Sequence, residues 1–320
     1  MPVLRRLGEQ TGPVAPGDAT GPALERIIRF TFTDPAPPPA PEDMRPFLNH
    51  MESLYGRFDD LSWLTGGSLV NYHDMVRTVV QELGPALADV DLVITVDGSP
   101  DCQHQSFPGA LLTELLPGDP LMMGISEQGV AGPFTALRVA HQQLRSGGAR
   151  RALVLVMEQS TLPPDDAAVC PVRDVAVALL LGPDGTVGLD APTLTVTRTG
   201  PAAWPDTDAG SVVVGAAVPD PPEGVPVRRA EPDHPCAGVW LALADLLAAE
   251  PPAGRVLVVD RDPVRPYQCA ITLTVPAPVR PAPPAHTAAR GRPATARPAA
   301  TTSRPRRRAT AGSGPGVRGG

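Results

Sequence analysis

Short apolar runs alternate with amphipathic segments along residues 91–188. Apolar runs bounded by turn residues predict strands covered on both faces, and apolar positions at three- and four-residue spacing predict helices. The glycine pair Gly147–Gly148 is a typical stop for the longest of these helices. The predicted order is strand 91–97, helix 108–116, strand 121–125, helix 133–148, strand 151–158 and strand 173–185.

The region before this stretch predicts one strand and two helices. Alternating β-branched and polar residues indicate a strand over Glu25–Thr33, and a stiff proline-rich linker follows over Asp34–Asp43. Helical spacing of apolar residues then covers residues 46–58 and 69–87.

After Gly188 the same pattern returns more weakly, which indicates two duplicated halves over residues 23–188 and 189–276, the second one truncated. Residues 1–22 are predicted to be loose. Residues 277–320 are rich in Pro, Ala and Arg, cannot bury a core and are predicted to be a disordered tail. The elements predicted in the second half are strands 193–199 and 211–218, helix 237–250, and strands 255–262 and 268–275.

Composition and charge narrow the class of partner. The 320 residues include no lysine, and the 42 prolines and 31 glycines are typical of GC-rich coding, as in actinomycetes. Nine arginines and no acidic residue fall after residue 275, whereas residues 1–275 hold 18 arginines against 34 acidic residues. An acidic body repels phosphates, and the tail lacks aromatic residues that stack on bases, so no nucleic-acid partner is expected.

The four cysteines are widely spaced and form no CxxC pair, so neither a zinc site nor a disulfide framework is predicted. The N-terminus has no apolar signal-peptide core, and no apolar run approaches the roughly 18 residues that a membrane span needs. We therefore expect a cytoplasmic chain with no membrane association and no metal. A dinucleotide-binding GxGxxG and a serine-hydrolase GxSxG are both absent from the sequence.

Four segments, in this order, resemble the condensing enzymes of the thiolase fold, especially the initiating β-ketoacyl-ACP synthases of type III. They are VDLVITVDGSPD, the stretch from GVAGPFTALRVA to ALVLVME, RDVAVALLLG, and AGVWLALADLL with RVLVVDRD. The resemblance implies an α/β, thiolase-like, five-layer αβαβα fold. It also implies dimerisation, which we expect through the strand after the long helix, residues 151–158.

The family loads its acyl group on a cysteine at the start of that helix, where the helix dipole favours the thiolate. In GISEQGVAGPF the resemblance places Val130 at the cysteine position, with Gly129 beside it. Valine cannot carry an acyl group. Histidine is also absent between His141 and His234, where the family's catalytic histidine is expected.

Other residues are weighed as replacements for the lost chemistry. Glu127 is a candidate general base if it is buried. Asp233 and His234 fall near the family's asparagine segment, and His234 is a candidate base, although a surface-loop role is slightly favoured. Cys102 is a candidate loop thiol that is expected to be half-buried and inert. Cys236, at a helix start two residues after His234, is a candidate reactive thiol whose pKa the helix dipole would lower, although cysteines at such positions are more often packed than reactive.

Two functions follow from the resemblance. The first is a non-condensing ketoacyl synthase-like partner, in a homodimer or a heterodimer with an active ketoacyl synthase of fatty-acyl or polyketide secondary metabolism. The second is an acyltransferase of the same fold that uses no cysteine nucleophile. No bound cofactor is expected; a thioester of coenzyme A or of an acyl carrier protein is compatible with either function, and the carrier protein itself is a compatible partner.

Overall fold

The computed structural model describes residues 21–34, 41–58, 61–103, 107–163, 169–196, 204–205, 208–221, 223–249 and 252–277. These residues belong to the unit Met1–Pro278, and Val279–Gly320 forms a second unit. Nearly all of the predicted disordered tail and of the predicted loose N-terminus lie outside the described residues. The account below concerns the first unit alone.

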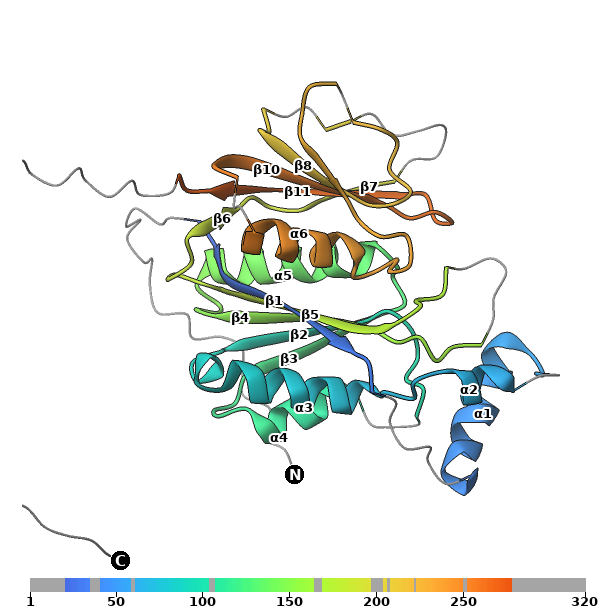
Figure 1. Ribbon diagram of the computed structural model, residues 1–320. Coiled ribbons are helices and arrows are strands. Elements are labelled where there is room, and N and C mark those ends of the chain that lie inside the picture. Colours follow the sequence, from blue (N-terminus) through green and yellow to red (C-terminus); the bar gives the residue numbers. More distant parts are fainter. Residues whose placement is uncertain are drawn as a thin grey trace, which may run out of the picture. The chain divides into compact units, whose positions relative to one another are not determined.

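The first half is a five-stranded part of the sheet in the order β3-β2-β4-β5-β1 (Figure 1). β2 is parallel to both β3 and β4, whereas β5 is antiparallel to both β4 and β1. Every residue of β2, β4 and β5 is buried, as the continuous apolar runs predict. The strands are β1 (Ala23–Phe32), β2 (Leu92–Asp97), β3 (Leu121–Ser126), β4 (Ala152–Glu158) and β5 (Asp174–Gly182).

Helices cover both faces of this half. Apolar side chains of α3 (Tyr72–Leu83), the 3-10 turn η1 (Gly84–Leu87) and α4 (Pro108–Leu115) pack in one core cluster, while α5 (Ala131–Ser146) packs in another. The Asn71 side chain accepts a hydrogen bond from the Asp74 backbone N–H at the start of α3. Two further helices, α1 (Pro41–Tyr55) and α2 (Ser62–Gly66), share a small separate cluster.

The second half repeats the strand order of the first. Its path β9-β8-β10-β11-β6 has β8 parallel to β9 and β10, and β11 antiparallel to β10 and β6, which matches β3-β2-β4-β5-β1 strand for strand. β6 also pairs with β1 and so joins the two halves. The elements are β6 (Val187–Leu189), β7 (Thr193–Val196), β8 (Ser211–Val214), β9 (Val227–Arg229), α6 (Gly238–Ala249), β10 (Gly254–Arg261) and β11 (Tyr267–Val275).

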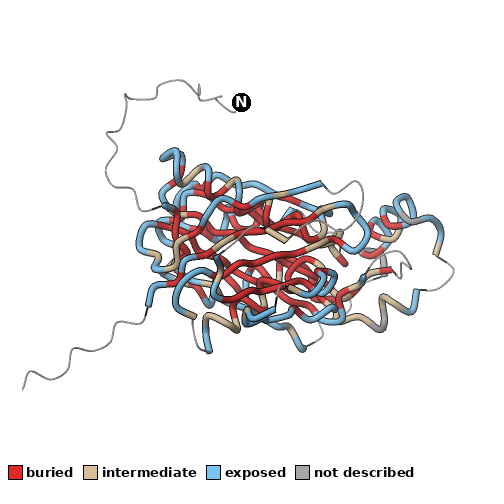
Figure 2. Tube along the Cα trace, turned by 90° about the horizontal axis from the view of Figure 1, so that it is seen from above, coloured by how far each residue is buried: buried red, intermediate tan, exposed pale blue. Residues whose placement is uncertain are grey.

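The duplication explains the layers seen in Figure 1. α5 and α6 lie between the two halves of the sheet, where the Phe134 and Trp240 rings are 5.0 Å apart. In the view from above, buried segments fill the interior and exposed segments lie mostly at the periphery (Figure 2). α3 and α4 form the outer layer of the first half. Within the described residues no helix lies on the outer face of the second half, so four of the five expected layers are described.

Two strand predictions need correction. β3 was predicted to be buried, but it lies at the end of the sheet and exposes Leu121 and Met123, because only β2 pairs with it. The segment expected to form a dimer edge corresponds to β4, which is paired on both sides by β2 and β5. β4 therefore has no free edge, and β3 is the edge strand of this half.

Candidate functional site

The site lies at a sharp turn between β3 and α5. Glu127 (φ 57°) and Gly129 (φ 53°) both have left-handed backbone conformations, and the Glu127 N–H donates to Asp97 O at 3.2 Å. This conformation is costly for a residue with a Cβ and favours glycine. The turn reverses the chain so that α5 starts immediately after Val130 and runs back between the two halves of the sheet.

Val130 precedes the first residue of α5 and has an exposed fraction of 2%. It lines a largely apolar cavity of about 250 Å³ together with His234, Val239, Asp260 and the small residues Gly215–Ala217. Burial raises the pKa of Asp260 well above its usual value, which favours the neutral carboxyl group. The side chain that the start of α5 presents to this apolar cavity is therefore a hydrocarbon.

Gly129 is held under a turn from the second half. Asp262 Oδ1 accepts hydrogen bonds from the backbone N–H groups of Val264 (3.0 Å) and Arg265 (2.7 Å), and its Oδ2 lies 3.6 Å from Arg265 Nη1. A Cβ at position 129 would collide with the Asp262 carboxylate. The Asp262–Arg265 turn thus closes over the β3–α5 turn and leaves room for a glycine only.

A Gly129→Ala variant is expected to lose about 2–4 kcal/mol of its free energy of unfolding, since it adds left-handed strain and displaces Asp262. Gly147→Ala is the matched control: Gly147 also has a positive φ (74°), but an added Cβ there meets nothing within 4 Å. Urea unfolding of both variants measures the difference. An equal loss in the two would show that the Asp262 turn does not constrain Gly129.

His234 is buried beside a carboxylate from the other half. Glu158, at the end of β4, accepts hydrogen bonds from the backbone N–H groups of Cys236 (2.6 Å) and Ala237 (2.9 Å) just before α6. Its Oε2 lies 3.6 Å from Nδ1 of His234. A carboxylate is favoured at a helix N-terminus, where N–H groups lack partners. The surface-loop interpretation of His234 is therefore wrong, whereas Asp233 beside it is partly exposed.

Burial favours the neutral form of three of the four thiols. Burial raises the pKa of Cys236 well above its usual value, and the nearby Glu158 carboxylate raises it further, so the prediction of a lowered pKa is wrong. Burial raises the pKa of Cys102, whose side chain is fully buried instead of half-buried, and raises that of Cys269 to about 12. None of these three supplies a thiolate nucleophile at neutral pH.

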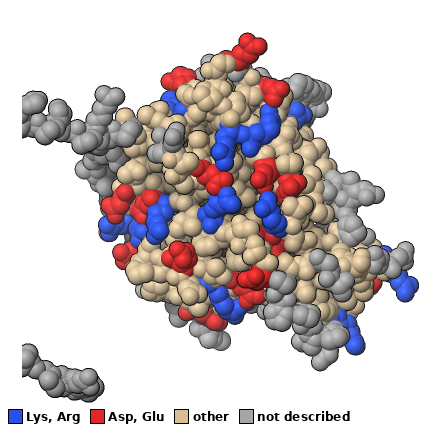
Figure 3. All heavy atoms as spheres, viewed as in Figure 1, with Lys and Arg blue, Asp and Glu red and all other residues tan. Residues whose placement is uncertain are grey.

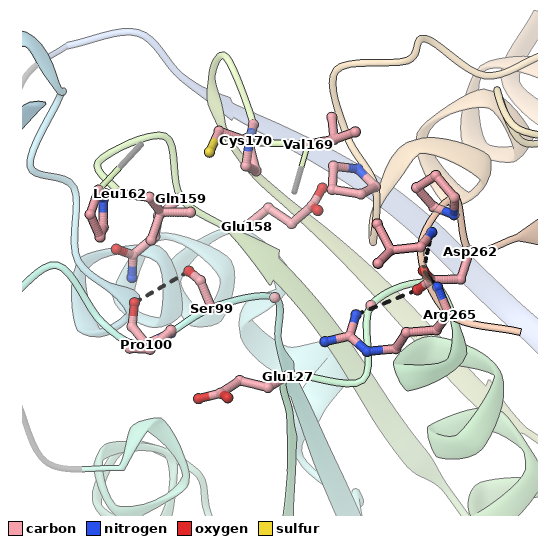
Figure 4. Close-up of a pocket in the computed structure, with 17 residues that line it drawn as sticks. Ser99, Pro100, Glu127, Glu158, Gln159, Leu162, Val169, Cys170, Asp262 and Arg265 are labelled. Atoms are coloured by element: carbon pink, nitrogen blue, oxygen red, sulfur yellow. Dashed lines mark hydrogen bonds and ion pairs between the residues drawn. The ribbon is translucent and has the colours of Figure 1, made fainter. Parts of the chain in front are cut away.

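A second cavity of about 250 Å³ opens beside the first (Figure 4). Glu127, Glu158, Cys170 and the Asp262–Arg265 turn line it, and Cys170 is partly exposed. Glu127 is exposed and extends away from Asp262, so the burial on which its role as a general base depended is not found. Asp97 precedes Gly98, which lines this cavity. Its pKa is raised to about 7, mainly by burial and to a smaller extent by the nearby Asp101 carboxylate.

Three groups that shape the site were not predicted from the sequence: Glu158, Asp262 and Arg265. The sequence carried a signal for Glu158 only, because it is the one acidic residue of an otherwise apolar strand. Among the described residues no cluster of three or more histidine, cysteine or acidic side chains could hold a metal ion. Within the same residues, every helix is too short or too polar to cross a membrane.

Comparison by sequence finds no matching family and no matching curated protein. Solved structures do match. An acyltransferase, ChlB3, is 17% identical over 81% of this chain and 98% of its own, with a TM-score of 0.53. OleA from Xanthomonas campestris, in a variant form, is 12% identical over 79% and 98%, with a TM-score of 0.53.

The 3-oxoacyl-(acyl carrier protein) synthase III, FabH, of Pseudomonas aeruginosa is also similar. It is 15% identical over 81% of this chain and 100% of its own, with a TM-score of 0.51. At these identities the likeness concerns the fold. Together with the duplicated strand order, it shows that this chain has the thiolase-like fold of the ketoacyl synthase III-type enzymes.

Proposed function

We propose that this chain is a non-condensing, ketoacyl synthase-like partner protein that keeps the thiolase-like fold and lacks a nucleophile. The observation that carries the proposal is Val130. It stands at the start of the central helix α5, is buried, and faces a cavity that it shares with His234. A helix start inside a cavity is where a thiolate would be stabilised, and an alkyl side chain there supports no covalent acyl transfer.

The surroundings of Val130 support the same proposal. The Asp262–Arg265 turn lies against Gly129, and both Glu158 oxygens are occupied by backbone N–H groups. These groups stabilise the contact between the halves, which leaves them poorly suited to act on a thioester. The protein would keep a binding surface for a partner, or for an acyl carrier protein or coenzyme A thioester, while another chain performs condensation.

The partner role is tested with an active ketoacyl synthase of the same source, co-expressed with this chain. We expect the two to co-elute in size-exclusion chromatography, and the purified chain alone to release no carbon dioxide from malonyl-coenzyme A. Decarboxylation by the chain alone would contradict the non-condensing role. Separate elution of the two proteins would contradict the heterodimer.

The edge strand β3 is the surface that we propose for dimerisation, with a second copy or with a synthase. Leu121 (58% exposed) and Met123 lie on this strand, and Phe107 is exposed beside it. An unpaired strand edge offers N–H and C=O groups to a second strand, and exposed apolar side chains add burial. This places the expected interface on β3 instead of β4.

A Leu121→Glu variant is expected to weaken self-association or synthase binding about 100-fold, because a charge would be buried at the strand pairing. Val196→Glu is the control, since Val196 is equally exposed (57%) on β7 of the other half. Analytical ultracentrifugation measures both dissociation constants. Equal effects of the two substitutions would exclude β3 as the interface.

One observation favours the second candidate function, a cysteine-independent acyltransferase: His234 is buried in the same cavity as Val130. If His234 acts as a base, His234→Ala should lower acyl transfer from acetyl-coenzyme A to a small amine or alcohol about 100-fold or more. His50→Ala, at an exposed position, is the control. The partner-protein proposal predicts no transfer above background for the unsubstituted chain or for either variant.

A further inference from the structure

We propose that an arginine-lined pocket beside α6 binds the phosphate group of a small phosphate monoester. The pocket, of about 250 Å³, is distinct from the two cavities at the β3–α5 turn, and the proposal does not depend on the partner role. Arginines from three parts of the chain converge on it: Arg29 of β1, Arg173 before β5, and Arg228 and Arg229 of β9. Figure 3 shows arginine and acidic side chains intermixed over the middle of the face on which α6 lies.

The local charge contrasts with the rest of the molecule. Residues 1–275 are strongly acidic, yet four of their 18 arginines line this one pocket together with two carboxylates, Glu231 and Asp245. Arg229 already donates to the backbone carbonyls of Gly215 and Val218 and to Asp220 Oδ1, so the arginines that face an incoming anion are Arg29, Arg173 and Arg228. An excess of guanidinium groups in a concave site raises the local concentration of anions. The pocket is therefore an anion-attracting site on a body that otherwise repels anions.

The present partners of these arginines are exchangeable. Arg29 Nη1 lies 2.6 Å from Asp245 Oδ1, Arg228 Nη2 lies 3.4 Å from Asp245 Oδ2, and Arg173 Nη2 lies 2.8 Å from Glu231 Oε2. The three arginine side chains are about half exposed. Exposed ion pairs of this kind contribute little to stability, so an incoming anion can replace or share them at small cost.

The arrangement favours a phosphate over a carboxylate. One arginine can satisfy both oxygens of a carboxylate, whereas the three terminal oxygens of a phosphate monoester accept hydrogen bonds from several guanidinium groups in different directions. Arg29, Arg173 and Arg228 approach from different strands and each uses one terminal nitrogen in the hydrogen bonds found within the described part of the chain. Their remaining N–H groups are the donors that we assign to the phosphate.

The pocket also shares a residue with the candidate site. His234 lines it with an exposed fraction of 4%, and its Nδ1 lies 3.6 Å from Glu158 Oε2. His234 also lines the cavity of Val130, so a ligand in the arginine pocket would contact a residue of the candidate site.

The test is isothermal titration calorimetry of the purified chain with inorganic phosphate, n-butyl phosphate and acetate at constant ionic strength. We expect saturable binding of both phosphates and at least about 10-fold weaker binding of acetate. Arg173→Gln and Arg228→Gln should each raise the phosphate dissociation constant about 10-fold or more. Arg255→Gln is the control, because Arg255 forms comparable exposed ion pairs with Asp190 and Asp208 away from the pocket.

A substitution of opposite sign separates binding from damage to the fold. Asp245→Asn removes the carboxylate that Arg29 and Arg228 share, and is expected to tighten phosphate binding several-fold. Circular dichroism confirms that each variant is folded. The proposal is overturned if phosphate does not saturate, if acetate binds as well as phosphate, if Arg255→Gln weakens binding as much as Arg228→Gln, or if Asp245→Asn weakens it. Binding of inorganic phosphate without n-butyl phosphate would overturn the assignment to a monoester.

Discussion

A Val130→Cys variant is expected to take up an acyl group from acetyl-coenzyme A, which the natural chain is not expected to do. The thiol would stand at the start of α5, where the helix dipole stabilises a thiolate, and would face the cavity that contains His234. Cysteine is slightly smaller than valine, so the packed turn can accept it. Intact-mass spectrometry in a Cys170→Ser background, which removes the partly exposed thiol, measures the adduct.

Val239→Cys is the matched control for this experiment. Val239 lines the same cavity, but it lies on α6, whose N-terminus is already occupied by the Glu158 carboxylate. A thiol at position 239 is not at the start of α5, so the dipole of that helix does not stabilise its thiolate, and the Glu158 carboxylate nearby disfavours the thiolate. It is therefore expected to remain unmodified. Adducts on both variants would mean that the cavity binds thioesters without any preference for position 130. The absence of adducts on both would argue against an acyl site at the start of α5.

A Glu158→Gln variant is expected to lose about 3–5 kcal/mol of its free energy of unfolding. The two carboxylate oxygens accept from the N–H groups of Cys236 and Ala237, and the side chain is 99% buried. An amide offers one oxygen and turns its NH₂ group toward the other N–H, which leaves a buried donor unsatisfied. Because Glu158 belongs to β4 and its partners precede α6, the loss would weaken the contact between the two halves.

Glu127→Gln is the control, since Glu127 is exposed at the mouth of the neighbouring cavity and its substitution should change stability by less than about 0.5 kcal/mol. Equilibrium urea unfolding of the two variants gives the comparison. A Glu158→Gln protein as stable as the natural one would show that the β4 carboxylate does not hold α6.

The strands were the part of the fold most readily predicted from the sequence. Runs such as Leu92–Asp97 and Ala152–Glu158 are mostly apolar because both of their faces are covered, by α5 on one side and α3 on the other. The same rule failed for Leu121–Ser126. Its apolar side chains are exposed at a sheet edge, and composition alone does not separate a buried strand from an edge strand that awaits a partner.

The candidate site was predictable only where it is local. The glycine at position 129 and the helix that follows could be read from the turn, because left-handed backbone favours glycine. The contacts of Glu158 with residues 236 and 237 span 78 and 79 positions, and those of the Asp262 turn with Gly129 span more than 100. Such contacts depend on how the duplicated halves face one another. The three-residue strands β6 and β9 were missed because they are too short to show a period.

The most direct test of the central claim is intact-mass spectrometry of the unsubstituted chain after incubation with acetyl- and malonyl-coenzyme A. A buried valine where α5 begins, together with burial that raises the pKa of Cys102, Cys236 and Cys269, predicts that the mass of the protein does not change. An acyl adduct on any cysteine, Cys170 included, would contradict the proposal that this thiolase-like protein lacks a nucleophile.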